Sequence, residues 1–219
     1  MNALRSFWGS TIGKKIVMAV TGLIGVGFVV GHMLGNLQVF LGPTKFNAYA
    51  HFLRSLGELL WVVRGVLVAA VVLHVVAAVQ LSRQRLAARP VGYRHGSQHE
   101  VSTFASRTIR WGGALLLLFI VFHILHFTTL DIFRDYSASD VYANVIRGFR
   151  VWWVVLLYVA AMVALGLHLY HGIWSSLRTI GASKASPNPL RRPAAATLAI
   201  VVWLGFTVIP VAIFAGLYP

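Results

Sequence analysis

The sequence predicts an all-α integral membrane protein, a single domain over residues 1–219 built as a bundle of five transmembrane helices. The chain is 58% hydrophobic and only 11% charged, which is too apolar for a soluble domain. Its apolar residues gather in five runs, each long enough to cross a hydrocarbon core about 30 Å thick. Most charged residues fall between these runs, where water or lipid headgroups can solvate them.

The five spans are expected at about residues 16–41, 59–82, 109–130, 151–177 and 194–217. The first run is too long for the apolar part of a cleavable signal peptide, so we expect it to remain as a span. Residues 44–56 predict a surface helix, and residues 131–150 predict a loop. Near that surface helix, His51 and Glu58 are either part of a solvated face or a polar patch close to a quinone.

The distribution of charge predicts the orientation. The formal net charge is +14, and about two thirds of the 19 basic residues fall on the side of the N-terminus. Four of the five acidic residues fall on the other side, namely Glu58, Asp131, Asp135 and Asp140. By the positive-inside rule, the N-terminus is expected in the cytoplasm and the C-terminus outside. Because the basic residues lie in loops between spans, we expect lipid and protein partners and no nucleic acid.

Four of the spans each carry a histidine deep in the apolar run: His32, His74, His123 and His168. An imidazole is costly in hydrocarbon unless it has a partner. The alternating topology puts His32 and His123 near the outer side, and His74 and His168 near the cytoplasmic side. Two pairs at two depths suit two stacked bis-histidine haems, because haem iron takes one axial ligand on each face.

Other uses of these histidines stay open. Intramembrane histidines also serve proton relays or bind copper or zinc, although no span interior here contains Asp or Glu to support a relay. The ligand set is open too, because His126 and His171 each lie three residues beyond a candidate on nearly the same helix face. The depth of His126 even matches that of His32 slightly better than His123 does. The absence of cysteine excludes disulfides, zinc–thiolate sites and iron–sulfur clusters bound by this chain alone.

The chain resembles the di-haem cytochrome b558 membrane-anchor subunits of succinate:quinone oxidoreductases, the succinate dehydrogenases and fumarate reductases. The resemblance covers nearly the whole chain and rests on five spans with this order of histidines. Its motifs are Gly31 with His32, NAYAHF at residues 47–52, His74, FHILHF at residues 122–127 and LHLYHGIWS at residues 167–175.

The resemblance implies a role for each histidine. His74 and His168 would ligate the inner of two b-type haems, and His32 and His123 would ligate the outer one. Two further histidines would lie beside the haems, near a propionate or a quinone: His126 and His171. One departure concerns Gly166, because some di-haem fumarate reductases carry a proton-conducting glutamate at this position. The glycine argues against a proton path along this helix.

The resemblance also implies a place in a complex of the bacterial cytoplasmic membrane. A flavoprotein with covalent FAD and an iron–sulfur subunit would dock on the basic cytoplasmic face, and a higher oligomer of the complex is compatible with this arrangement. Electrons from succinate would reach a quinone, menaquinone by the same resemblance. The chain alone has no dinucleotide motif and no soluble domain to hold the dicarboxylate. The alternatives are a di-haem b-type subunit of another oxidoreductase, such as a hydrogenase or a cytochrome b561-like protein, and a transporter with histidine gates.

The predicted orientation can be tested with a reporter that is active only in the cytoplasm. Fused after Pro219, the reporter should be silent, because the charge bias places the C-terminus outside. The same reporter fused ahead of Met1 is the control and should be active. An active reporter after Pro219 would contradict the orientation.

Overall fold

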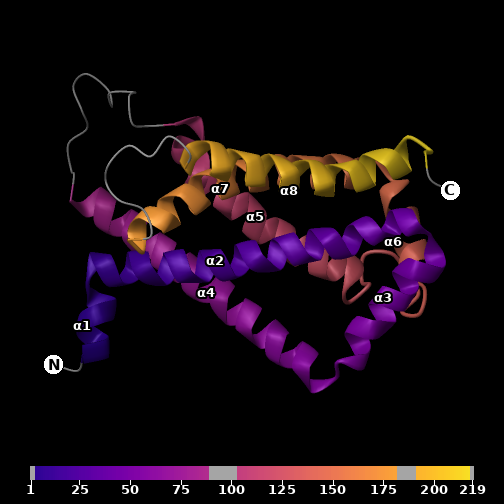
Figure 1. Ribbon diagram of the computed structural model, residues 1–219, viewed down its shortest axis with the longest axis horizontal. Coiled ribbons are helices and arrows are strands. Elements are labelled where there is room, and N and C mark those ends of the chain that lie inside the picture. The colour runs from indigo at the N-terminus through magenta and orange to yellow at the C-terminus, as the bar shows by residue number, and fades with distance from the viewer. Residues whose placement is uncertain (1–2, 89–102, 182–190, 218–219) are drawn as a thin grey trace.

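The computed structural model describes residues 3–88, 103–181 and 191–217, and these residues contain helices and no strand. Five of the helices are long and apolar enough to cross a membrane, as predicted. These helices are α2 (Thr11–Leu37), α4 (Glu58–Ala87), α5 (Phe104–Phe127), α7 (Trp152–Thr179) and α8 (Arg191–Phe214). Figure 1 shows α2 and α8 along the long axis of the molecule, with α4 and α5 oblique to it. The remaining helices are short: α1 (Ala3–Gly9), the 3₁₀ helix η1 (Gln38–Leu41), α3 (Pro43–Ser55) and α6 (Val141–Phe149).

The predicted spans are correct in number, and the helices that contain them begin and end a few residues from the expected limits. The third span was expected at 109–130, but α5 begins at Phe104, because the Thr103 hydroxyl caps the helix by accepting a hydrogen bond from the Ser106 amide at 3.2 Å. It ends at Phe127, and Leu130 beyond it has a φ of 64°. Hydropathy does not detect such caps, so each limit moves by up to about one and a half turns. Much of the basic loops falls at residues 89–102 and 182–190, outside the described residues.

The segment 131–150 is not simply the loop that the sequence predicted, because it contains α6. Asp140 starts this helix by accepting a hydrogen bond from the Ala143 amide at 3.0 Å. Val145, Ile146 and Phe149 are buried on its inner side. The prediction was wrong because so short a helix needs only a few apolar residues, and three acidic residues nearby dominate the composition of the segment.

α3 and α6 form a layer across one end of the bundle, on the right in Figure 1; because the charge distribution predicts this end outside, we call it the outer end. Asn47 on α3 joins them, because its amide nitrogen donates to Asp140 at 3.0 Å and its oxygen accepts from the Tyr142 amide at 2.9 Å. The bonds from Ala143 and Asn47 also hold the pKa of the Asp140 carboxyl below its usual range. The surface helix predicted after the first span is therefore α3, and it is fastened to α6.

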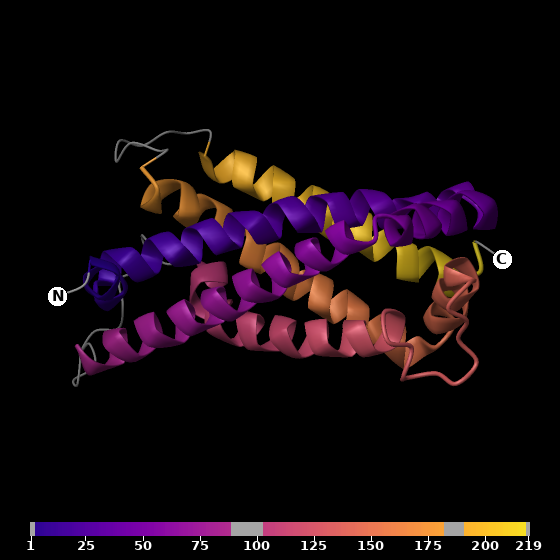
Figure 2. The ribbon, with the colours of Figure 1, turned by 90° about the horizontal axis from the view of Figure 1, so that it is seen from below.

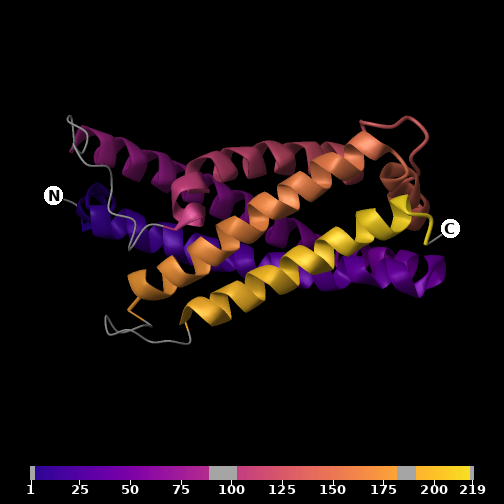
Figure 3. The ribbon, with the colours of Figure 1, turned by 90° about the horizontal axis from the view of Figure 1, so that it is seen from above.

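α2 and α7 form the centre of the bundle. α2 packs against α4, α7 and α8, and Figure 1 and Figure 2 show α4 crossing it at an angle. α7 packs against both α5 and α8, and Figure 3 shows it running between them. By contrast, the pairs α2–α5 and α4–α7 do not pack extensively on one another. The four helices that carry the predicted histidines are α2, α4, α5 and α7. Contacts with other helices hold them in place, while α2 stays apart from α5 and α4 from α7.

Candidate functional site

The structure brings the four predicted histidines together as two pairs. His32 on α2 faces His123 on α5, with ring centroids 5.8 Å apart, and we call these two the outer pair. His74 on α4 faces His168 on α7, with ring centroids 6.1 Å apart, and these are the inner pair. Along α7, Tyr158 contacts the outer pair and His168 belongs to the inner pair, so the two pairs lie about 15 Å apart.

The inner pair contains one hydrogen-bonded ring and one ring whose Nδ1 has no hydrogen-bond partner among the described residues. His74 Nδ1 lies 3.2 Å from Thr21 Oγ1, and the Thr21 hydroxyl donates to the Val17 carbonyl oxygen at 2.7 Å. The hydroxyl therefore accepts from His74, which places the proton on Nδ1 and leaves the lone pair of Nε2 free. His168 Nδ1 is buried without a hydrogen-bond partner among the described residues. Such an atom costs free energy, so it fits a site that a further group completes.

The outer pair is enclosed by aromatic rings. His32 stacks on Phe28, with ring centroids 5.2 Å apart and 14° between the planes. His123 stacks on Phe119 at 5.8 Å and 28°, and its Nδ1 lies 3.0 Å from the phenol oxygen of Tyr158. As in the inner pair, one ring has its Nδ1 occupied by a hydroxyl group, which orients the ring and leaves Nε2 available.

His126 lies next to the outer pair but has no free ring nitrogen. Its side chain is 0% exposed. Its Nδ1 lies 3.0 Å from the phenol oxygen of Tyr158, and its Nε2 lies 2.8 Å from the phenol oxygen of Tyr136. A metal ligand needs an unshared nitrogen lone pair, so the hydrogen bonds favour His123 over His126 as a ligand.

The remaining predicted polar residues are not members of the two pairs. His171 is partly buried, one turn beyond His168, with its ring 6.4 Å from that of Trp174. His51 on α3 and Glu58 at the start of α4 are both exposed. Their exposure agrees with a solvated face.

The spacing of each pair fits two imidazoles on opposite sides of one iron atom. With Fe–N bonds of about 2 Å, the ring centroids of opposite ligands are about 6 Å apart, close to the observed 5.8 and 6.1 Å. Zinc and copper sites take three or four protein ligands, whereas each pair supplies two. Among the described residues, no group of three or more His, Asp or Glu side chains could hold a metal ion. The pairs therefore fit haem iron better than a bare ion.

Glycines leave space on the helix faces that point toward the pairs. Gly25 lies two turns before His32 on the same face of α2, and a Cβ at Gly25 would have no heavy atom within 4 Å. A Cβ at Gly22 would lie 3.2 Å from His74 Cε1, and a Cβ at Gly113 would lie 3.7 Å from His168 Cε1. Small residues at these positions allow a ring or a flat ligand to approach the backbone closely.

Gly166 has a different neighbour. A Cβ at Gly166 would meet Trp203 Cβ on α8 at 3.5 Å, so the tryptophan covers this position. The position where this chain has glycine instead of the glutamate of some di-haem fumarate reductases is therefore one where α7 packs closely against α8. In this chain the position serves helix contact.

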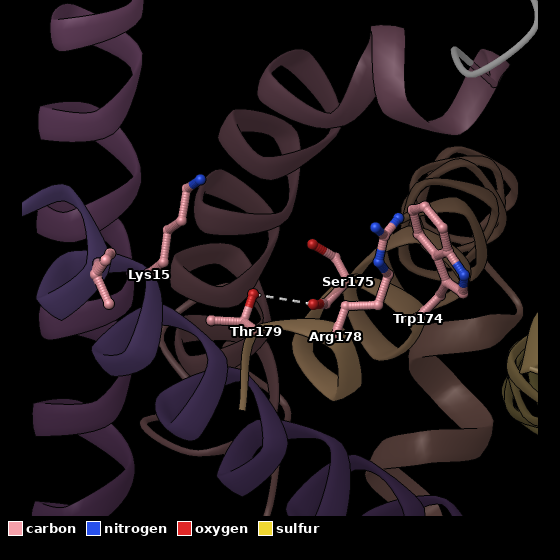
Figure 4. Close-up of a pocket in the computed structure, with 6 residues that line it drawn as sticks. Lys15, Trp174, Ser175, Arg178 and Thr179 are labelled. Atoms are coloured by element: carbon pink, nitrogen blue, oxygen red, sulfur yellow. Dashed lines mark hydrogen bonds between the residues drawn. The ribbon is translucent and has the colours of Figure 1, made fainter. Parts of the chain in front are cut away.

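A basic pocket lies between the ends of α2 and α7 on the side of the inner pair. It has a volume of about 360 Å³ and is lined by Ile12, Lys15, Trp174, Ser175, Arg178 and Thr179. Figure 4 shows Lys15 and Arg178 on opposite sides, with Ser175 and Thr179 between them. The Arg178 guanidinium lies over the Trp174 ring, 5.2 Å from its centroid. Two cations with nearby hydroxyl groups suit a carboxylate or a phosphate group.

Sequence reasoning missed the hydroxyl groups that hold the histidines. Tyr158 and Thr21 are polar residues within apolar spans, and that was a signal, because such groups need partners there. Tyr136 gave no comparable signal, since it lies in a polar segment between helices. Its contact with His126 depends on the fold of that segment.

Comparison with known protein families gives one match. The model of the succinate dehydrogenase/fumarate reductase transmembrane subunit matches residues 86–208, which is more than half of the chain. The matched range includes His123 and His168, whereas His32 and His74 lie before it. No curated protein and no solved structure matches the chain.

The space beside Gly25 can be tested by filling it. Replacing Gly25 by Leu should weaken the binding of a haem at these pairs by about 1–3 kcal/mol, or roughly 5- to 150-fold, because the side chain would enter the region between the two pairs. Haem per polypeptide, measured from the absorbance of the purified protein, is the readout. Gly27→Leu is the matched control, since Gly27 is exposed on the opposite face of α2. Equal haem loss in both variants would contradict the assignment.

Proposed function

The chain belongs to the family of succinate dehydrogenase/fumarate reductase transmembrane subunits, and we propose that it is a di-haem cytochrome b anchor of such a complex. In this role it passes electrons from an iron–sulfur subunit to a membrane quinone. The observation that carries the proposal is the pair geometry, with ring centroids 5.8 and 6.1 Å apart at two depths. As a membrane subunit, the chain is part of an oxidoreductase complex and does not itself perform the dicarboxylate chemistry.

Each pair has a defined task in this proposal. His74 and His168 hold the haem nearer the cytoplasm, and His32 and His123 hold the outer one. Each haem, when bound, supplies a one-electron carrier inside an insulating core. Thr21 keeps the proton of His74 on Nδ1, so that Nε2 can ligate iron.

The separation of the pairs supports passage of electrons across the membrane. Two carriers about 15 Å apart along α7 divide a core about 30 Å thick into short steps. The inner pair lies on the side of the basic loops, where the soluble flavoprotein and iron–sulfur subunits would dock. Menaquinone is the proposed acceptor, on the strength of the resemblance to di-haem members of the family.

The pocket at the inner end supports the same orientation. Lys15 and Arg178 would meet anionic groups there, either haem propionates or the headgroups of the cytoplasmic leaflet. His171 lies one turn from this pocket and is a candidate to contact the same groups. His126 is committed to tyrosines on both ring nitrogens, which supports His123 as the outer ligand on α5.

The ligand assignment predicts which substitutions remove haem. His168→Ala or His74→Ala should each abolish the inner haem, and His123→Ala or His32→Ala the outer one, because a bis-histidine site needs both ligands. Haem content and reduced-minus-oxidised spectra of the purified protein measure this. His171→Ala is the control, on the same helix as His168; it should retain both haems, because losing a contact with a propionate leaves both histidine ligands of each iron in place. Full haem content in His168→Ala would refute the assignment.

The role in electron transfer is tested on the complex as it exists in the membrane. Gentle extraction should recover the chain with a flavoprotein and an iron–sulfur protein, and succinate should reduce at least the inner haem. As a control, a preparation stripped of the soluble subunits should stay oxidised with succinate and be reduced by dithionite. The proposal fails if the chain is recovered with hydrogenase subunits. It also fails if succinate leaves the haems of the intact complex oxidised while dithionite reduces them.

A further inference from the structure

The outer end of the bundle contains a continuous chain of four hydrogen-bonding side chains. Tyr136 contacts His126 Nε2 at 2.8 Å, and Tyr158 contacts both His126 Nδ1 and His123 Nδ1 at 3.0 Å. The groups come from three parts of the molecule: the segment before α6, α5 and α7. The chain therefore runs from the outer layer to one member of the outer pair.

The direction of these hydrogen bonds follows from the chemistry of the groups. If His123 uses Nε2 as a ligand, its neutral ring carries the proton on Nδ1 and donates it to Tyr158. The Tyr158 phenol then donates to His126 Nδ1. This leaves the His126 proton on Nε2, where it donates to Tyr136. Each group has one donor and one acceptor to use, so the choice at His123 fixes the whole chain.

The middle of the chain is buried and closely packed, and its Tyr136 end is half-buried. His126 is 0% exposed and Tyr158 is 6% exposed. The Tyr136 ring stacks on Phe127, with 9° between the planes, and burial raises the pKa of the Tyr136 phenol, so this group stays protonated. A Cβ at Gly148 would meet the Tyr136 phenol oxygen and lie 2.9 Å from His126 Nε2, so α6 leaves these groups no room to move. Hydrogen bonds in such a setting strengthen one another.

In the part of the chain that the structure describes, the inner pair has no comparable arrangement. His74 bonds one hydroxyl, and that hydroxyl donates to a backbone carbonyl of its own helix. His168 Nδ1 has no partner among the described residues. The two pairs therefore differ in what surrounds their second ring nitrogens, although their ring spacings are nearly equal.

We propose that Tyr158, His126 and Tyr136 are positioning residues that fix the orientation and tautomer of His123 and lower the reduction potential of the outer haem. An acceptor on Nδ1–H makes an imidazole a stronger electron donor to iron, which favours the oxidised form. This inference rests on the proposed function, because it requires the outer pair to ligate haem. It goes further by giving the two haems different environments and by linking one ligand to the outer layer.

The test is a redox titration of each haem in the purified holo-complex, followed in the visible spectrum. The outer haem is identified as the one lost in His123→Ala. Tyr158→Phe should keep both haems, raise the potential of the outer haem and leave that of the inner haem unchanged, because the ring stays and the acceptor is lost. Tyr136→Phe should raise the outer potential by less, since it removes the far end of the chain. In Tyr158→Phe the low-spin electron paramagnetic resonance signal of the outer haem should also move.

Two controls separate this effect from a loss of structure. Tyr142→Phe should move neither potential, because its ring packs on Phe46 rather than on a histidine. Thr21→Val should raise only the inner potential, because Thr21 accepts from His74. An unchanged outer potential in Tyr158→Phe, or an equal shift of both haems, would overturn the inference.

The outcome also separates this inference from the proposed function. If the wild-type protein contains fewer than two haems, the proposed function fails, and the inference about the hydrogen-bonded chain fails with it. A second outcome is that both haems are present and reduced by succinate, while Tyr158→Phe changes neither the potential nor the resonance signal of the outer haem. In that case only the inference about the hydrogen-bonded chain is refuted.

Discussion

A polar ring nitrogen inside an apolar helix bundle must have a partner, and the placement of the histidines in this chain follows from that requirement. His126 meets it fully, with a tyrosine on each nitrogen. His123 and His74 each use one nitrogen for a hydroxyl group and keep the other one free. His168 finds no protein partner for its buried Nδ1 among the described residues. This difference in hydrogen bonding separates His126, which is structural, from His74, His123 and His168, which are available to a ligand.

The helix arrangement is consistent with this constraint. α2 and α7 hold the bundle together through α4, α5 and α8, and the facing helices of each pair are not packed directly on each other. Glycines at positions 22, 25 and 113 keep the backbone clear beside the rings. At the outer end, α3 and α6 cover the bundle, and the bonds of Asn47 keep those two helices together. The site is therefore built from long-range contacts, although each histidine stands in a simple apolar helix.

Much of the fold could be predicted because a span of about 20 apolar residues has few other uses. The depth of each histidine followed from the same argument, since alternating spans fix which end is which. The choice between His123 and His126 did not follow, because the two lie on one face of one helix and match His32 in depth almost equally. The structure distinguishes them through tyrosines on α7 and in the segment before α6, which no local pattern brings together. The helix α6 and the cap at Thr103 were missed for a similar reason, because each depends on one hydrogen bond from a backbone amide to a side-chain oxygen.

Close packing of Trp203 against Gly166, in a chain whose span interiors contain no Asp or Glu, bears on energy conservation. In the proposed electron carrier, α7 offers no carboxylate that could take up a proton when an electron moves from the inner to the outer pair. Charge then moves through part of the electric field of the membrane. One elementary charge that crosses the whole membrane changes in free energy by about 2.3 kcal/mol per 100 mV of membrane potential. A step over about half the core therefore changes it by about 1 kcal/mol per 100 mV. With the cytoplasm negative, the field favours electrons that flow outward. Succinate oxidation by such a complex would therefore draw on the membrane potential.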